Sequence, residues 1–589
     1  MYQKINETLG RIKSAAIKYP VTLLMSLTMT AAAIFLIESD YNNKIQNFIA
    51  FKILLVSALG ISLSFGLSML SQRMNKFGFL AYLCIPFVIG FYFLLPADED
   101  DFTVKYFFLF APAYVLSHLL VAFVPFLKSE NSETDFWEYN KKLFVNFFLT
   151  VVFTGVLCGG VELAITAVDN LFNMDFDGNI YPDTFMFFLI FGSTLIFLLF
   201  TGDGLEKLEE KSDYPNVLKF FTQFVLIPLL IIYVVILYLY SIKILINWEL
   251  PRGWVSYLVL VYSMVGILAL LLVHPLRGDD AKSWVRIFGK MFYYTLIPLL
   301  VLLFVAIFTR LLEYGFTEAR YYVVLLALWL TLIVGYFALK KNPGIKFIPI
   351  SLFVFGIFSL LMPFANAFSV VKNSQKKELM KVLTENKLLK DGKIDFSREV
   401  KSQVVDEISD KFRFLDERGQ LDYLLTLVDD NQSRNKAPGY RSWDFRRKFK
   451  IIVYANGPEY SKNYQYYTID NLKTSYETED YDYLIPFVGE SGKKFNIGED
   501  TLKIDRESNQ FKLTLNDKFE KDMMPEIKKI VNENSNSIND KQVDDLSVLA
   551  DLGPYRIKVL IGDISVNTDG VNEPNYRVVD FVILASKKE

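Results

Sequence analysis

The chain has 589 residues, of which 52% are hydrophobic, 16% aromatic and only 22% charged, and its formal net charge is −3. This near-neutral balance gives no reason to expect a nucleic-acid partner, because nucleic-acid-binding surfaces are strongly basic. The two cysteines, Cys84 and Cys158, both fall inside apolar runs, which argues against a disulfide or a redox pair.

These averages combine two regions of different character. Residues 1–375 contain 27 of the 62 Lys and Arg residues, mostly in short clusters between long apolar runs. Residues 376–589 contain the other 35, together with 39 acidic residues, which is typical of a water-soluble region. The stretch before residue 19 is too polar for a signal peptide, so 19–37 is predicted to be a retained first span.

Eleven apolar runs in the first region are long enough to suggest membrane spans. A hydrocarbon core of roughly 30 Å needs about 20 helical residues, and inside lipid a helix satisfies its own backbone hydrogen bonds. The sequence therefore predicts a polytopic α-helical membrane protein with about 11 transmembrane helices. The predicted spans are 19–37, 48–70, 77–95, 107–127, 143–165, 184–200, 220–246, 255–273, 291–308, 321–339 and 347–368.

Lysine and arginine divide unevenly between alternate loops of this arrangement. One set of loops holds 19 of the 27 basic residues and the other set holds 8. Because cytoplasmic loops carry the excess of positive charge, we expect the amino terminus to be cytoplasmic. An odd number of spans then places the carboxyl-terminal region on the extracytoplasmic side.

The interiors of the predicted spans are almost free of charge. Glu162 is the one acidic residue within a run, whereas proton relays and ion-coupled transporters carry ionisable groups in their spans. This pattern disfavours a transporter or flippase but leaves it as an alternative, with a polar path through Glu162, Asp169 and Lys243. The histidines His118 and His274 are too far apart to predict a metal site.

The loop between the fifth and sixth spans carries the sharpest local motif. Asn173, Asp175 and Asp177 alternate like the first ligands of a calcium loop. Thr184 occupies the twelfth position, where such a loop needs a bidentate Glu. An acidic turn is therefore the favoured interpretation, and these three residues are the only metal-ligand candidates. No cofactor is predicted.

From the seventh span onward, several short stretches resemble one family. They are Tyr214-Pro215, Leu226-Ile-Pro-Leu229, Leu237-Tyr-Leu-Tyr240, Lys243, Leu250-Pro-Arg-Gly-Trp-Val-Ser256, Arg310, Glu313-Tyr-Gly-Phe-Thr-Glu318, Arg320-Tyr321 and Ile348-Pro-Ile-Ser-Leu352. In these stretches, and over roughly residues 10–370, the chain resembles a bacterial polytopic membrane family, domain of unknown function four-one-five-three. The resemblance implies a bacterial inner-membrane protein and supplies neither an activity nor a catalytic residue.

Two of these stretches lie in predicted outer loops, on the side to which the carboxyl-terminal region is assigned. The loop within 250–256 is predicted to make a tight turn beside an interfacial tryptophan. The loop within 310–320 contains equal numbers of basic and acidic residues. We therefore expect both loops to form an interface that seats the carboxyl-terminal region on the membrane region. The predicted interface residues are Arg252, Trp254, Arg310, Glu313, Glu318 and Arg320.

The carboxyl-terminal region begins with helical patterns and continues with strands. A basic amphipathic stretch predicts a helix over 372–390, and apolar residues at helical spacing predict more helix over 397–428. Short runs separated by turn residues predict an α+β domain with a mostly antiparallel sheet or a sandwich. The predicted strands are 449–454, 464–469, 483–488, 501–504, 511–515, 555–566 and 576–584, with one helix at 519–534. The predicted domains are 1–371 (transmembrane), 372–430 (helical linker) and 431–589 (extracytoplasmic α+β).

This region offers little chemistry. It contains neither Cys nor His, and the stretch 489–493 matches neither a phosphate loop nor a nucleophile elbow. Tyrosines crowd 454–483, where they suggest either a stacking surface or cross-strand aromatic pairs.

The leading interpretation of function is therefore non-enzymatic: a membrane anchor that presents an extracytoplasmic domain to an envelope protein, a glycan or a lipid. A transporter or flippase is the second interpretation. A membrane enzyme that acts on a lipid-linked substrate is the third, with Asp98–Asp101 and Glu249 as its carboxylates.

Overall fold

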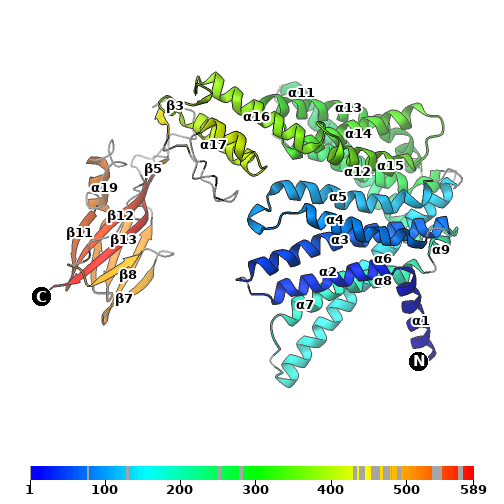
Figure 1. Cartoon of the computed structure of the whole chain (residues 1–589), viewed down its shortest axis with the longest axis horizontal. Coiled ribbons are helices and arrows are strands. Elements are labelled where there is room, and N and C mark those ends of the chain that lie inside the picture. The colour runs from blue at the N-terminus through cyan, green and yellow to red at the C-terminus, as the bar shows by residue number, and fades with distance from the viewer. Residues whose placement is uncertain are drawn as a thin grey trace. The chain divides into compact units, whose positions relative to one another are not determined.

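The computed structural model of the chain forms two compact units, Met1–Ile451 and Ile452–Glu589. Figure 1 labels their helices and strands. The predicted domain boundaries after residues 371 and 430 stay predictions. The structure describes residues 2–40, 42–75, 78–127, 132–174, 176–202, 204–247, 254–277, 283–428, 434, 436, 443, 445–446, 448–452, 464–468, 478, 480–486, 492–507, 509–533, 547–567 and 575–588.

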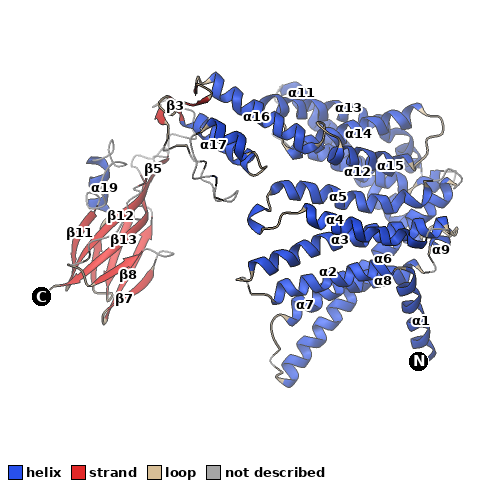
Figure 2. Cartoon of the chain, in the orientation of Figure 1, coloured by secondary structure: helices blue, strands red, loops and turns tan. Residues whose placement is uncertain are grey.

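The first unit is built almost entirely from helices, as Figure 2 shows. Their bounds are α1 Tyr2–Lys18, α2 Pro20–Glu38, α3 Lys44–Met74, α4 Cys84–Leu94, α5 Val104–Phe123, α6 Glu133–Phe172, α7 Ile180–Phe187, α8 Ser193–Thr201, α9 Leu205–Glu209, α10 Asn216–Phe220, α11 Ile227–Asn247, α12 Trp254–Leu272, α13 Ser283–Tyr314, α14 Glu318–Leu339 and α15 Phe347–Leu361. Short 3-10 and π segments join or interrupt them: η1 Gly78–Leu83, η2 Glu99–Asp101, η3 Val124–Phe126, η4 Phe188–Gly192, η5 Phe221–Leu226 and η6 His274–Arg277.

Within the described residues, nine helices are long and apolar enough to cross a membrane. They are Pro20–Glu38, Lys44–Met74, Val104–Phe126, Glu133–Phe172, Ile180–Thr201, Asn216–Asn247, Val255–Leu272, Trp284–Tyr314 and Glu318–Leu339. The two other predicted spans form shorter apolar helices, Phe79–Leu94 and Phe347–Leu361. The membrane-length helical character is thus confirmed, and in the described part of the chain length and composition support nine candidate spans, which does not confirm the predicted eleven.

The last predicted span, 347–368, is not one continuous helix. α15 ends just before Met362, whose φ of −68° and ψ of 117° are extended. Pro363 follows, and a residue that precedes proline is disfavoured in the helical region. Asn366 then caps a new helix, α16 (Ala367–Glu385), by accepting a hydrogen bond from a first-turn amide. The 15 residues of α15 rise only about 22 Å, which explains why length alone does not make it a span.

Small polar residues help to hold the first helices together. Ser62 of α3 hydrogen-bonds to Ser117 of α5 at 2.6 Å, and Thr22 of α2 bonds to Ser64 of α3 at 2.9 Å. Lipid supplies no hydrophobic drive between helices, so hydroxyl pairs and close packing take over this role. Figure 1 shows α2–α5 side by side. Helix α15 packs against α5 and also against α14, so it connects this first group of helices to the later one.

A small mixed subdomain follows α16 in the first unit. It contains β1 Leu389–Lys390, β2 Lys393–Ile394, β3 Glu399–Lys401, α17 Ser402–Asp416 and α18 Leu421–Leu427, and β3 pairs with β4 Lys450–Ile452. Its core joins Leu379 of α16 to Phe412 of α17 and to Phe445. The predicted helix 397–428 is therefore a strand followed by two helices.

The second unit is a sandwich of two antiparallel sheets. One sheet has the order β11-β12-β13-β6, with β5 also paired to β12, and the other has the order β10-β9-β8-β7. Phe511 of β9 meets Phe581 of β13 edge to face at 4.7 Å, which joins the two inner faces. The predicted antiparallel sheet region is confirmed. The bounds are β5 Tyr464–Thr468, β6 Tyr483–Pro486, β7 Lys493–Ile497, β8 Asp500–Glu507, β9 Gln510–Leu515, β10 Phe519–Asp522, α19 Met524–Glu533, β11 Ser547–Leu552, β12 Tyr555–Asn567 and β13 Asn575–Lys587.

The predicted helix 519–534 is wrong at its start. Asn516 and Asp517 adopt φ values of 52° and 55°, the left-handed geometry of a tight hairpin turn. The turn reverses the chain and pairs Phe519 with Leu515, so the residues after it extend β9 into a hairpin as strand β10. Helix α19 begins only after this strand.

Candidate functional site

Helix α16 holds the loop that connects α13 to α14. Gln375 is 4% exposed, and its Nε2 donates to the carbonyl oxygens of Tyr314 at 3.0 Å and Phe316 at 2.8 Å. The Oγ of Ser374 accepts a hydrogen bond from the amide of Phe316 at 2.9 Å. Gly315, with φ of +70°, makes this close approach feasible. The first helix after the apolar runs is therefore fixed to the α13–α14 hairpin.

Glu318, the first residue of α14, forms a buried ion pair with Arg418. The Nε and Nη2 atoms of Arg418 donate to the two carboxylate oxygens of Glu318 at 2.6 and 3.0 Å. The side chains are 9% and 2% exposed for Arg418 and Glu318, respectively. The guanidinium also lies 3.4 Å from the ring centroid of Phe414. A two-point contact of this kind fixes orientation as well as distance.

A cavity of about 150 Å³ opens beside this pair, where three helix ends converge. The first turn of α12 contributes Ser256 and Tyr257, the last turns of α13 contribute Ile307 and Arg310, and the first turns of α14 contribute Arg320 and Val323. Arg310 and Arg320 both lie close to the ring of Tyr314, at 5.9 and 5.3 Å from its centroid. Two cations thus share one small cavity.

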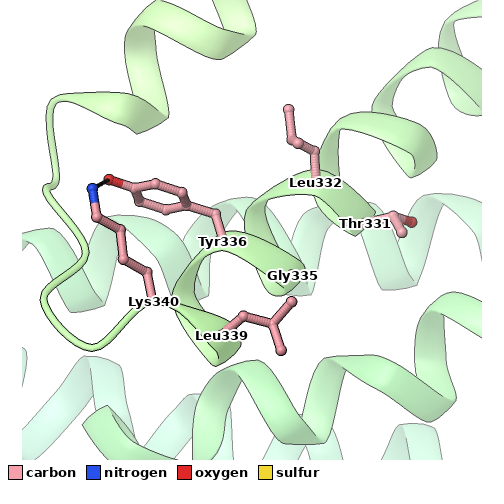
Figure 3. A pocket seen from close by; sticks show the side chains of 6 residues that line it. All are labelled: Thr331, Leu332, Gly335, Tyr336, Leu339 and Lys340. Carbon is pink, nitrogen blue, oxygen red and sulfur yellow. Dashed lines mark hydrogen bonds between the residues drawn. The ribbon is translucent and has the colours of Figure 1, made fainter.

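A second, open groove runs along the other part of α14, as Figure 3 shows. Its volume is about 570 Å³, and its lining is almost entirely apolar. At one end, the Nζ of Lys340 donates to the hydroxyl of Tyr336 at 3.2 Å, and the amide of Gly344 donates to the same oxygen at 3.1 Å. On a membrane-length helix this groove suits an acyl chain, and it contains no arrangement suited to catalysis.

A polar network occupies the bundle end at which α6 begins. Lys141 is buried and pairs with Glu138 at 2.7 Å, and its Nζ also donates to the Oγ of Ser212 at 3.0 Å. The Nε1 of Trp137 donates to the carbonyl oxygen of Leu271 at 2.7 Å, and its ring lies 4.7 Å from the Nζ of Lys141. The Ser212 contact fixes the loop before α10 on α6, and the Leu271 contact fixes the end of α12 there.

Tyr214 extends this network. Its ring stacks on Trp137 with centroids 5.8 Å apart, and its hydroxyl donates to the carbonyl oxygen of Leu272 at 3.0 Å. Burial raises the pKa of Tyr214 to about 12, so the hydroxyl stays protonated as a donor. A hydrogen bond from Lys207 lowers the pKa of Glu210 in the same loop. These contacts fix the position of the loop before α10.

The structure brings together part of the predicted interface. Arg310 and Arg320 share the cavity, and Glu318 lies beside it in its pair with Arg418. Glu313 is exposed at the same loop. Arg252 lies outside the described residues, and Trp254 is described only as the backbone start of α12.

Sequence reasoning missed Arg418 and Ser256. Arg418 is 100 residues from its partner, and no spacing rule connects the two. Ser256 closes one of the stretches that resemble the family, and that position was its only signal.

Two of the three predicted metal candidates, Asn173 and Asp177, lie within the described residues, where they have local backbone roles. Asn173 ends α6 in a left-handed conformation, and the carboxylate of Asp177 accepts a hydrogen bond from the amide of Asn179 at 3.2 Å. Asp175 lies outside the described residues. Among the residues that the structure describes, no three His, Cys, Asp or Glu side chains are close enough to hold a metal ion.

The residues of the alternative functions are scattered too. Glu162 and Asp169 lie on α6, whereas Lys243 is exposed on α11, and no contact among the described residues joins them. Asp98–Asp101 are exposed around η2, and Glu249 lies outside the described residues. The Nδ1 of His118 donates to the carbonyl oxygen of Tyr114 in the same helix, at 2.9 Å.

The tyrosine-rich stretch 454–483 is described only in part. Its side chains are described at Tyr481 and Tyr483. Tyr483 packs against Tyr555 with ring centroids 6.4 Å apart. The other tyrosine side chains of the stretch lie outside the described residues, so the stacking surface stays a prediction.

Comparisons with known proteins place the chain among relatives. A family model described as "Domain of unknown function (DUF4153)" matches residues 24–390. The chain is 35% identical over 192 residues to "Uncharacterized protein PM1469" of Pasteurella multocida (strain Pm70). That alignment covers 32% of this chain and 31% of the relative, so the chain spans about a third of the length of the curated relative it matches. No solved structure matches it.

Proposed function

This chain belongs to the family described as "Domain of unknown function (DUF4153)", and we propose that it is an inner-membrane anchor that presents an extracytoplasmic binding domain. The partner is an envelope protein, a glycan or a lipid. The observation that carries the proposal is the buried Glu318–Arg418 pair, which ties the start of the carboxyl-terminal region to the α13–α14 hairpin. A region attached in this way is held at one face of the membrane.

Contacts between helix ends support eleven crossings in place of nine. The Nε of Arg73, at the end of α3, donates to the carbonyl oxygen of Pro125 just after α5, at 3.1 Å. The segments η1, α4, η2 and α5 lie between these residues, so η1–α4 carries the chain back over the distance that α5 covers. Likewise, the hydroxyl of Tyr321 in α14 donates to the carbonyl oxygen of Ala365 at 2.8 Å, so α15 returns over the length of α14.

The distribution of positive charge supports the orientation. With eleven crossings, 19 of the 27 Lys and Arg residues in 1–375 fall on one side. That side is the bundle end with Arg73, Lys141 and Lys346, which the positive-inside rule assigns to the cytoplasm. α16 then begins at the other, extracytoplasmic end, beside Glu318.

A reporter fusion tests the orientation. Alkaline phosphatase folds into its active form outside the cytoplasm, so a fusion after Lys376 is expected to be active in whole cells. The matched control is a fusion after Lys207, in a loop assigned to the cytoplasm, which is expected to be inactive. An inactive fusion after Lys376, with the fusion protein present at normal level, would refute the proposed side.

Capture of a partner tests the binding role. The full chain and a variant that lacks 452–589 are purified in a mild detergent, and the molecules that co-purify are compared. We expect an envelope protein, a glycan or a lipid that accompanies the full chain and is absent from the truncated variant. The same set of molecules on both chains would contradict a binding role for the second unit.

A further inference from the structure

The cavity between α12, α13 and α14 has the chemistry of an anion site. It is lined by Arg310 from the end of α13 and by Arg320 from the first turn of α14. The Nη1 of Arg320 donates to the carbonyl oxygens of Gly315 at 2.8 Å and Tyr314 at 3.3 Å, which fixes the guanidinium in place. Its other nitrogens have no hydrogen-bond partner among the described residues.

Protein groups compensate these two cations only in part: Glu313 attracts Arg320 electrostatically, whereas Arg310 repels it. Among the described residues, Arg310 forms no ion pair and no hydrogen bond, and its one close contact is the ring of Tyr314. Glu318, the nearest buried carboxylate in the sequence, is fully engaged with Arg418. Glu313 is exposed, and no ion pair joins it to either arginine. Two guanidinium groups held in one small cavity repel each other unless an anion lies between them.

Ser256 supplies a second, independent observation. It lines the same cavity and is 7% exposed, yet its hydroxyl has no hydrogen-bond partner among the described residues. Ser263, two turns later on α12, shows the usual alternative: its hydroxyl donates to the carbonyl oxygen of Val259 at 2.7 Å. The Oγ of Ser256 is not among the fully buried unpaired polar atoms of the described residues, so it is open to the cavity and can donate to a ligand oxygen beside the two arginines.

The directions of two helices add to the positive electrostatic potential that the arginines create in the cavity. Ser256 lies in the first turn of α12 and Arg320 in the first turn of α14. The first turn of a helix has free amide groups and the positive end of the helix dipole. One of these amides, that of Arg320, is capped by the Oγ1 of Thr317 at 3.5 Å. The cavity therefore faces two positive helix ends in addition to two guanidinium groups.

The size and lining of the cavity limit the class of ligand that it can bind. A cavity of about 150 Å³ is well below the roughly 300–1,000 Å³ of pockets for drug-sized ligands. It suits a single phosphate group better than a nucleotide or a saccharide. The guanidinium fork matches phosphate oxygens, and Ile307 and Val323 continue the wall with apolar surface toward the membrane interior. These features fit a headgroup phosphate whose acyl chains remain in the bilayer.

We propose that Arg310, Arg320 and Ser256 bind the phosphate of an anionic phospholipid headgroup at this end of the bundle. The oxyanion lies between the two guanidinium groups, and the Ser256 hydroxyl donates to it. The proposal concerns binding, and it does not depend on which side of the membrane this end faces. The lipid joins the ends of α12, α13 and α14 beside the Glu318–Arg418 pair.

Native mass spectrometry of the full chain in detergent tests this site. The probes are phosphatidylglycerol, phosphatidylcholine and inorganic phosphate, each added to delipidated protein. We expect preferential binding of phosphatidylglycerol and a loss of about tenfold or more in its affinity for Arg310→Gln and Arg320→Gln, because each removes charged hydrogen bonds. Arg286→Gln, at the other end of α13, is the matched control and is expected to bind like the natural chain.

Two further results decide the assignment. Ser256→Ala alters a single hydroxyl and is expected to weaken phosphatidylglycerol binding several-fold without affecting the fold, so the test stands even if an arginine variant is poorly folded. Unchanged affinity in all three variants overturns the site. Displacement of phosphatidylglycerol by inorganic phosphate, with inorganic phosphate binding lost in the same variants, shows that the source is free phosphate and overturns the lipid assignment.

Discussion

Arg418 and Glu318, 100 residues apart in the sequence, meet through two parallel hydrogen bonds of 2.6 and 3.0 Å. Both side chains are almost completely buried. The guanidinium is also packed on Phe414 and donates to that residue's carbonyl oxygen at 2.9 Å. Both hydrogen bonds of the carboxylate therefore come from one side chain two residues after the end of α17, and the docking of α17 on the hairpin depends on this pair.

Removal of one partner should release α17. In Arg418→Met, Glu318 is left buried without its cation, which typically costs about 3–5 kcal/mol, at least about a hundredfold in the local opening equilibrium. Amide hydrogen exchange of the full chain in detergent should show this increase over 402–416.

The double variant Glu318→Leu with Arg418→Met provides the control for this pair. Apolar replacement of both partners removes the unpaired charge, so exchange over 402–416 should be closer to that of the natural chain than in Arg418→Met alone. A double variant with exchange faster than either single variant would show that the pair does not act as a unit.

Gly315→Ala should loosen the contact between the hairpin loop and α16. A Cβ at this position would lie 2.8 Å from the Cγ of Glu378 and 2.9 Å from the Oγ of Ser374, at a φ of +70°. Left-handed geometry costs an alanine roughly 1–2 kcal/mol, and the clash adds to it. Gly392→Ala is the control, because Gly392 has a φ of +80° but no atom within 4 Å. Equal losses of thermal stability in both variants would argue against a packed loop.

Lys141→Met should destabilise the bundle end at which α6 begins. The substitution leaves Glu138 buried without its partner and removes the donor to Ser212, for an expected loss of about 3–5 kcal/mol. Lys211→Met, at an exposed position of the same loop region, should change stability by less than about 0.5 kcal/mol. Thermal unfolding in detergent measures both, and similar midpoints for the two variants would contradict the role of the buried pair.

The second unit should lose stability in acid through Asp500. Hydrogen bonds from Asn516, at 2.5 Å, and Tyr555, at 3.0 Å, lower the pKa of Asp500. A lowered pKa in the folded state means that the stabilising contribution is present above the unfolded pKa of about 3.9. It is lost as pH falls through the lower, folded pKa.

Tyr555→Phe tests this linkage. Loss of one donor raises the pKa of Asp500, so amide exchange in β8 and β9, corrected for the intrinsic rate at each pH, should accelerate at a higher pH than in the natural chain. Tyr481→Phe is the control, since no hydrogen bond of that hydroxyl is found among the described residues. An unchanged acid transition in Tyr555→Phe would show that Asp500 does not control it.

Hydropathy predicted where membrane helices lie but not where they end. α6 continues from Glu133 to Phe172, about 60 Å, although its apolar run covers only 143–165. Its start is set by a capping box in which the Ser132 side chain accepts from the Asp135 amide, outside the apolar run. α15 is shorter than its run for the opposite reason, since Pro363 ends it inside apolar sequence.

The candidate site was predictable only in part. Arg310 and Arg320 stand out as cations at the ends of apolar runs. In contrast, Glu313 and Glu318 look equivalent in sequence, and only the position of α17 distinguishes the exposed carboxylate from the buried one. Ser256 carries no hydropathy signal, because its importance lies in its place in the cavity wall beside the two arginines. Such information exists only in the packed structure.

Strand β13 imposes an order on the synthesis of the second unit. It pairs with β12 on one side and with β6 on the other, and it contributes Phe581 to the joint core of both sheets. The sandwich cannot form completely until residues 575–587 have been synthesised, because β13 is the strand that lies between β12 and β6. Until then β6 and β12 each have an unpaired edge, which is the feature of a sheet that favours association with another chain.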